Sequence, residues 1–247
     1  MMKLFLVLLT LLSLAVGHAK NNEAKIAMGL TKPPYIFTDT ESGLECEIIR
    51  EAFKAVGIDF KPTFAPLNRG EIMLKSGDVD GATNKLEKTL DGYPSDPYID
   101  YHNVAASLKD RHLKIEKPSD LANYSVAAFQ TAQKILGPDF ESMANTNSNY
   151  VEVAEQKLQV MQLLKKRVDV IIGDILIIQH YQRQFKEDSG IKEEISIHDL
   201  FKTTSYVIMF KNAKLRDSFN LGLAKIRKSK KYAELLNKYS ISAQKKP

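Results

Sequence analysis

The chain of 247 residues contains one cysteine, Cys46, and no tryptophan. A single cysteine excludes an internal disulfide, and no cluster of histidine, cysteine and carboxylate residues has the spacing of metal ligands. Cys46 lies early in a predicted helix between Glu45 and Glu47, whose negative charges raise the pKa of a nearby thiol. We therefore interpret Cys46 as a small packed residue and expect neither a metal nor another cofactor.

Apolar runs are short as well. The run from Leu4 to Val16 falls short of the roughly 20 residues that a membrane-spanning helix needs. It follows Lys3 and precedes Gly17-His18-Ala19, an arrangement typical of a cleavable signal peptide. We predict that residues 1–19 are this signal peptide and that the protein is exported; an uncleaved anchor is the alternative.

An acidic excess is also missing, since the formal net charge is +5. The basic residues are spread out except at 225–231, which we interpret as a solvated helix face. Without basic residues interleaved with aromatics, the sequence gives no reason to expect a nucleic-acid partner. Hydrophobic residues make up 44% of the chain, so it can bury a core as one large domain or two small ones.

Strands and helices are expected to alternate in the first third of the chain. Apolar periodicity predicts strands at 25–30, 58–64 and 79–83, with helices at 47–56 and 68–75 between them. This βαβαβ order is typical of a mostly parallel sheet with helices on its faces.

A second unit follows Pro118, after a strand expected at 103–108. Its expected strands are 124–128 and the apolar, β-branched segment 168–172, and we expect Gly137-Pro138 to end a helix. Helices are predicted at 132–136, 153–165 and 175–185, and the chain ends with a strand at 204–210 and a helical region at 215–239.

Five short motifs occur in a fixed order along these elements. They are the strand at 25–30 followed by Pro33-Pro34-Tyr35, the segments 74–81 and 93–98, Asp120-Leu121 ahead of 125–130, and the segment 164–174. In this order the chain resembles the family 3 extracytoplasmic solute-binding proteins, the polar amino-acid receptors of bacterial ABC importers. The resemblance covers nearly the whole chain after its first twenty residues.

The resemblance implies an α/β protein with a two-lobed, type II periplasmic-binding-protein-like fold. Its sheets would be mixed and mostly parallel, with the ligand cleft between the lobes. Residues 22–104 and 205–247 would form lobe 1, and residues 105–204 would form lobe 2. The two crossings between the lobes would lie near 103–108 and 203–210.

The implied function is capture of a small polar ligand, an amino acid or similar, by hinge closure. The protein would be a periplasmic monomer that delivers its ligand to an ABC permease in the inner membrane. One alternative is a periplasmic sensor that signals to a membrane receptor. A dehydratase-like enzyme on the same fold is another, but the sequence shows no Ser/His/Asp or paired-carboxylate signature, so we expect no catalysis.

Asp174 is the first candidate ligand contact. It follows the predicted strand at 168–172, where the family places an aspartate against the amino group of the ligand. It also precedes a predicted helix, so it is equally an N-cap candidate, and both roles can hold together. Gln130 and Thr131 precede the helix predicted at 132–136, where backbone N–H groups favour anions, although the Gly-Thr of the family is Gln-Thr here. Simple capping is the alternative for Thr131.

Aromatic side chains are expected to form the walls of the site. The resemblance assigns Tyr35 to a position against the ligand, and Phe37, Tyr98 and Phe129 are further candidates. Each is equally consistent with a residue of the apolar core.

The anion-binding arginine of the family has no counterpart at its usual place. Between Asp80 and Ser95 the chain offers only Lys85 and Lys88, and a lysine does not reproduce the bidentate fork of an arginine. Arg69, at the start of the second predicted helix, is therefore a candidate for the missing contact, with a solvated helix residue as the alternative. Thr83 and Asn84 close the third predicted strand and are candidates for further polar contacts.

Overall fold

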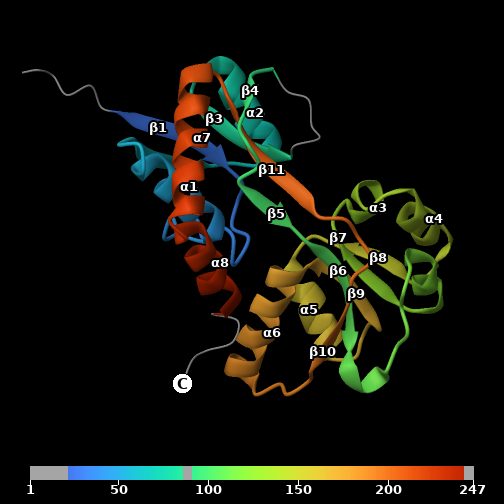
Figure 1. Cartoon of the computed structure of the whole chain (residues 1–247). Helices are drawn as coiled ribbons and strands as arrows, with labels where there is room; N and C mark the ends of the chain where they lie inside the picture. The colour runs from blue at the N-terminus through green and yellow to red at the C-terminus, as the bar shows by residue number, and fades with distance from the viewer. Residues whose placement is uncertain (1–21, 86–90, 242–247) are drawn as a thin grey trace, which may run out of the picture.

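The chain folds into two α/β lobes, each built on its own sheet (Figure 1). The computed structural model describes residues 22–85 and 91–241. The predicted signal peptide at 1–19 and Lys88 lie outside the described residues. Within the described part of the chain, no helix combines the length and hydrophobicity needed to cross a bilayer.

Lobe 1 contains a sheet of order β2-β1-β3-β11-β4, with β5 also paired to β11. Strand β1 runs parallel to β2 and β3, and β11 runs antiparallel to β3, β4 and β5. The strands are β1 (Glu23–Met28), β2 (Asp59–Phe64), β3 (Gly81–Lys85), β4 (Tyr93–Pro94), β5 (Ile99–Tyr101) and β11 (Thr204–Phe210). The helices are α1 (Leu44–Lys54), α2 (Leu67–Ser76), α7 (Ala213–Lys228) and α8 (Lys231–Ile241).

Helices α1 and α7 pack closely in lobe 1. A Cβ added to Gly222 of α7 would lie 1.9 Å from the backbone oxygen of Ala52 in α1, so only glycine permits this approach. Beside the contact, Phe53, Phe210 and Phe219 pack ring against ring with centroids 5.2–6.3 Å apart. These contacts fix α1 and α7 against the sheet.

Lobe 2 contains a sheet of order β10-β6-β9-β7-β8. All five residues of β9 are buried, because α4 covers one face of the sheet and α5 and α6 cover the other. The strands are β6 (Asn103–Leu108), β7 (Val126–Phe129), β8 (Tyr150–Val153), β9 (Val170–Asp174) and β10 (Ile195–His198). The helices are α3 (Ala132–Ile135), α4 (Pro138–Thr146), α5 (Gln156–Leu164) and α6 (Ile175–Ser189), with 3-10 turns η1 (Lys109–Arg111) and η2 (Pro118–Asn123).

Two short segments connect the sheets. His102 alone separates β5 in the first sheet from β6 in the second, and residues 199–203 lead back from β10 to β11. The His102 ring lies on the return segment, with Nε2 2.8 Å from Oδ1 of Asp199. Asn103 and Val104, predicted for lobe 1, pair in the second sheet, and Thr204, predicted for lobe 2, pairs in the first.

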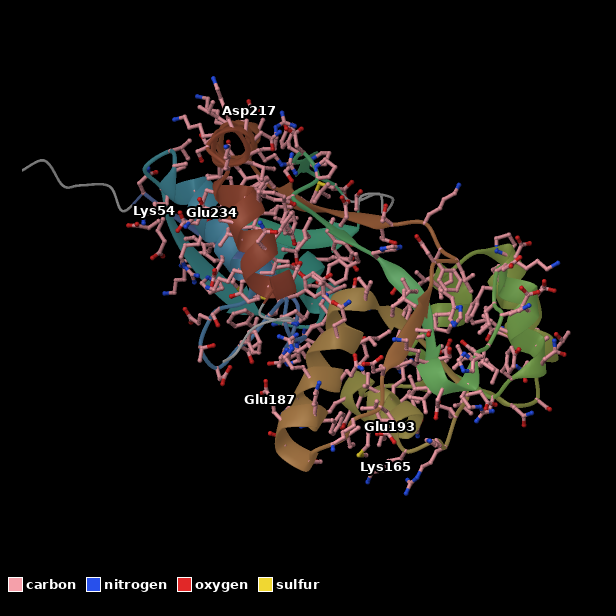
Figure 2. The ribbon with its side chains drawn as sticks, turned by 60° about the horizontal axis from the view of Figure 1, so that its bottom comes forward. Lys54, Lys165, Glu187, Glu193, Asp217 and Glu234 are labelled. Atoms are coloured by element: carbon pink, nitrogen blue, oxygen red, sulfur yellow. The ribbon has the colours of Figure 1, made fainter. Side chains whose placement is uncertain are left out.

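Figure 2 shows the same two bodies from below. The labelled Lys54, Asp217 and Glu234 lie on lobe 1, and Lys165 and Glu193 lie at the lower edge of lobe 2 in this view. Helix α6 lies on the side of lobe 2 that faces lobe 1, and its Ile177 joins the core cluster of lobe 1. The predicted two-lobed α/β architecture with mixed sheets is confirmed.

Several local details differ from the predictions. Gly137-Pro138 follows the end of α3, as predicted, but it also begins α4, which the sequence analysis did not predict, because proline is well tolerated in the first turn of a helix, where its missing N–H would have no partner within the helix. The helical region expected at 215–239 is two helices, α7 and α8, separated by Lys230 at φ 67°. Residue Val153 belongs to β8, so helix α5 begins only at Gln156.

Candidate functional site in the cleft between the lobes

A cavity of about 280 Å³ lies between the lobes. Both lobes line it, so a molecule bound there would contact both. Lobe 1 contributes Lys32, Leu67, Tyr101, Thr204 and Tyr206, and lobe 2 contributes Asn103, Phe129, Gln130, Thr131, Ile135, Gln156, Asp174 and Ile177.

Asp174 closes β9 and lines this cavity while remaining 3% exposed. It is the N-cap of α6, since its Oδ1 accepts hydrogen bonds from the N–H groups of Leu176 at 2.9 Å and Ile177 at 3.2 Å. The Tyr35 hydroxyl also donates to Oδ1, at 2.9 Å, and the His102 N–H donates to Oδ2 at 2.9 Å. The predicted N-cap is therefore present, and its carboxylate additionally joins the lobes.

The charge of Asp174 reflects two opposing effects. Burial raises its pKa above the ordinary value, whereas the hydrogen bonds from Tyr35 and the backbone lower it. From the described residues, Oδ1 accepts three hydrogen bonds and Oδ2 accepts one. Each carboxylate oxygen has two lone pairs, so Oδ2 retains room for another donor, such as a ligand ammonium.

Lys32 faces the same cavity from lobe 1. Its Nζ lies 4.1 Å from the ring centroid of Tyr101, 5.6 Å from that of Tyr206 and 5.8 Å from that of Tyr35. Three tyrosine rings thus surround one ammonium group, an arrangement that stabilises a positive charge. We call Tyr35, Tyr101 and Tyr206 the tyrosine cage.

Glu45 lies beneath the tyrosine cage and is 2% exposed. It accepts hydrogen bonds from the hydroxyls of Tyr98, at 2.6 Å, and Tyr101, and its Oε1 lies 3.5 Å from Lys32 Nζ. Burial, followed by the charge of Glu45, raises the pKa of both tyrosines, which keeps their hydroxyls protonated as donors. Glu45 is therefore a satisfied buried carboxylate that balances the charge of Lys32.

Phe129, the wall candidate that ends β7, and Gln130 and Thr131, which precede α3, line the lobe 2 side of the cavity. The N–H groups at this helix start already have an acceptor, because Thr131 donates to Glu152 Oε2 at 2.7 Å and Gln133 to Oε1 at 3.0 Å. Although burial opposes it, these bonds and one from Tyr150 lower the pKa of Glu152. The predicted anion position therefore holds a carboxylate of the chain itself. The Thr131 side chain makes no capping hydrogen bond.

The remaining predicted residues do not line this cavity. Phe37 lies 6.0 Å from His180 in a neighbouring groove, and Arg69 is exposed on α2. Thr83, Asn84 and Tyr98 are buried in lobe 1. Tyr35 is buried too and does not line the cavity itself, but it contacts two residues that do, Asp174 through its hydroxyl and Lys32 through its ring.

Sequence reasoning did not select Lys32 or Glu45. Lys32 directly precedes the Pro33-Pro34-Tyr35 motif in the segment that follows β1, and this position was the available signal. Glu45 stands between buried Leu44 and Cys46, and a charged residue in such a position was the corresponding signal.

Cys46 is buried against Met28, with its Sγ 3.9 Å from the methionine sulfur. Burial and then the Glu45 charge raise the pKa of its thiol to about 12. Cys46 is a packed residue, as predicted. Among residues 22–85 and 91–241, no group of three or more histidine, cysteine or acidic residues is arranged to hold a metal.

Comparison with known structures supports the fold. A protein from Bacillus subtilis is 24% identical with a TM-score of 0.69, over 88% of this chain and 90% of its own. A histidine kinase sensor domain with similarity to periplasmic binding proteins is 17% identical, with a TM-score of 0.66 over 88% and 95%. An amino-acid ABC transporter substrate-binding protein from Streptococcus pneumoniae, bound to L-arginine, is 18% identical, with a TM-score of 0.64 over 91% and 97%.

A search of curated protein sequences finds no match to this chain. The family model described as bacterial extracellular solute-binding proteins, family 3, matches residues 24–242. This match spans both lobes and the cavity between them, and it confirms the resemblance found in the sequence motifs. The chain therefore belongs to the family 3 bacterial extracellular solute-binding proteins.

Proposed function

We propose that the protein captures a small polar ligand, an amino acid or a similar molecule, in the cavity between its lobes. The observation that carries the proposal is the cavity itself, which both lobes line and where the buried carboxylate of Asp174 has room for one more donor. The Streptococcus pneumoniae neighbour, bound to L-arginine on a similar fold, supports an amino acid as the ligand class.

The protein acts by closure of the lobes around the ligand. Within residues 22–85 and 91–241, the chain crosses between the lobes at His102 and at 199–203, so backbone rotation in these segments changes the angle between the lobes. A ligand that contacts both lobes binds the closed state more tightly and shifts the population toward it. The closed form then delivers its ligand to an ABC permease in the inner membrane.

Asp174 contacts the ligand ammonium in this proposal, and Phe129, Gln130 and Thr131 provide the lobe 2 wall. The protein works in the periplasm as a monomer after removal of residues 1–19. Phe37, Arg69, Thr83, Asn84 and Tyr98 were also candidates for ligand contact, but they lie outside the cavity lining and are not part of this proposal.

A second candidate function is sensing, in which the closed form signals to a membrane receptor. The similar fold of a histidine kinase sensor domain favours this alternative. Deletion of the gene that encodes this protein in its host distinguishes the two functions. Importer function predicts loss of ligand uptake, whereas sensing predicts unchanged uptake and loss of a ligand-dependent transcriptional response.

A thermal-shift screen tests ligand capture directly. The panel contains the twenty standard amino acids, polyamines and small organic acids. A ligand present at 100 times its dissociation constant stabilises the folded state by roughly 2.7 kcal/mol, which is a visible rise in melting temperature. The proposal would be contradicted if none of the compounds raised the melting temperature. Chemical conversion of a bound compound would favour the enzyme alternative instead.

A further inference from the structure

We propose that Lys32 binds the carboxylate of the ligand and so replaces the arginine that the sequence lacks. This inference rests on the proposed function, capture of an amino acid. It specifies the ligand class as molecules that carry both an ammonium and a carboxylate group.

The Lys32 ammonium is held in place, but its hydrogen-bond donors are not all used by the described residues. The tyrosine cage surrounds it, and its side chain is still 28% exposed. It lines the central cavity and also a neighbouring one of about 310 Å³. An ammonium has three donors, yet within residues 22–85 and 91–241 its Nζ donates no hydrogen bond and has only the 3.5 Å contact with Glu45. Donors therefore remain for an anion in the cavity.

The positive charge of Lys32 is stabilised by the carboxylate of Glu45. Glu45 is buried and is itself held by the hydroxyls of Tyr98 and Tyr101. One of these tyrosines, Tyr101, also presents its ring to Lys32 Nζ at 4.1 Å. A fixed cation of this kind binds an anion without having to be ordered first, because its own neighbours already hold it.

The other anion-binding candidates are excluded by their positions. Lys32 is the only basic residue among the described residues that line the central cavity, and Arg69 is not one of them. The N–H groups of Thr131 and Gln133 donate to Glu152, so they are already occupied.

Asp174 completes the pattern with the opposite charge. Tyr35 contacts both groups, because its hydroxyl donates to Asp174 and its ring lies 5.8 Å from Lys32 Nζ. The cavity thus presents one cation and one anion that share a single neighbour. A zwitterion with its carboxylate at Lys32 and its ammonium at Asp174 matches both.

The tyrosine cage also permits a rival interpretation. A ligand cation could enter the cage and displace Lys32, in which case Lys32 would compete with the ligand. The two interpretations predict opposite effects of removing the lysine charge, so one variant distinguishes them.

The test uses calorimetry with the tightest-binding standard L-amino acid and with its α-carboxamide, which keeps the ammonium and loses the carboxylate. Wild-type protein should bind the acid more tightly than the amide by roughly 10- to 100-fold, as expected for one charge-assisted contact. Lys32→Met should lower affinity for the acid by a similar factor and leave affinity for the amide within about threefold of wild type. Lys157→Met is the matched control, because Lys157 lines only the neighbouring cavities, and it should preserve the preference for the acid.

Three results would overturn the inference. They are equal binding of acid and amide by wild type, unchanged affinity for the acid in Lys32→Met, and increased affinity in that variant. The wild-type comparison and a second variant, Lys32→Gln, decide the question even where Lys32→Met does not fold. Failure of every compound in the thermal-shift panel to bind would refute the proposed function and this inference together, whereas failure of the amino acids alone would refute only the inference. Binding without a carboxylate preference would refute the inference alone.

Discussion

The hydroxyl of Tyr35 donates a hydrogen bond to Oδ1 of Asp174 at 2.9 Å, and this bond joins lobe 1 to lobe 2. Tyr35 is 1% exposed, so water does not compete for the contact. Burial and the nearby Asp174 charge raise the pKa of Tyr35, which keeps the hydroxyl protonated and able to donate. Tyr35, which was predicted to contact the ligand, thus holds Asp174, whose carboxylate was predicted to bind the amino group of the ligand.

Tyr35→Phe should reduce the free energy of unfolding by about 1.5–3 kcal/mol, the usual contribution of a hydrogen bond to a charged acceptor. Only the hydroxyl is lost, so the packing of the ring persists. Urea denaturation measures the effect. Tyr124→Phe is the control, because within the described residues the Tyr124 hydroxyl makes no hydrogen bond. This variant should lose almost no free energy of unfolding. Equal losses in the two variants would show that the interlobe bond adds no stability.

Two variants of Asp174 should distinguish its role in ligand binding from its role as the N-cap of α6. Asp174→Asn keeps an oxygen for the N–H groups of Leu176 and Ile177 but removes the charge, so ligand affinity should fall more than a hundredfold, as for a broken buried pair worth about 3–5 kcal/mol. Asp174→Ala should lose the same affinity and, in addition, about 0.5–2 kcal/mol of stability from the missing cap. Calorimetry and urea denaturation measure the two effects. Unchanged affinity in Asp174→Asn would reduce Asp174 to a helix cap.

Gly222→Ala should destabilise the protein, although alanine is the better helix former by about 1 kcal/mol. The new Cβ would meet the Ala52 backbone oxygen at 1.9 Å, so α7 must move away from α1. A net loss of about 1–3 kcal/mol is expected for such overpacking, measured by urea denaturation. Leu221→Ala, at a neighbouring position that is 55% exposed, should change stability by no more than about 0.5 kcal/mol. A more stable Gly222→Ala variant would contradict the close packing of the two helices.

Acidification should destabilise the protein partly through His198. Burial lowers the pKa of His198 below its usual value of about 6.5, and its Nε2 lies 2.9 Å from Ser107 Oγ. The unfolded chain therefore binds the proton first as pH falls. The stability contributed by neutral His198 is complete above about pH 6.5 and is lost as pH decreases through the folded-state pKa.

The measurement is the free energy of unfolding between pH 7.5 and 5.5. His198→Gln should show a shallower decline than the wild type over this range. Burial also lowers the pKa of His180, so part of the decline should remain in the variant and disappear only when both histidines are replaced. Parallel curves for wild type and His198→Gln would exclude the contribution of His198.

Sequence patterns predicted the long elements well, because hydrophobic periodicity is a local property. Strand β9 and the N-cap at Asp174 follow from one apolar segment and the helix behind it. Strands β4, β5, β8 and β10 contain two to four residues each, too few for a periodic signal. They form because neighbouring strands of the sheet supply their hydrogen-bond partners.

The charged part of the site depended on contacts that no local pattern contains. Glu45 is separated by 53 residues from Tyr98 and by 56 from Tyr101, whose hydroxyls satisfy its carboxylate. Glu152 is 21 residues from Thr131, whose N–H it accepts. Only the folded chain shows that the predicted anion position is filled and that Lys32 stands in a cage.

His102 forms one of the two crossings between the lobes and also contacts the other crossing and Asp174. Its N–H donates to Asp174 Oδ2, and its ring lies on Asp199 of the return segment. In the closure proposed above, backbone rotation at either crossing would therefore be passed on to the other crossing and to the Asp174 carboxylate through His102.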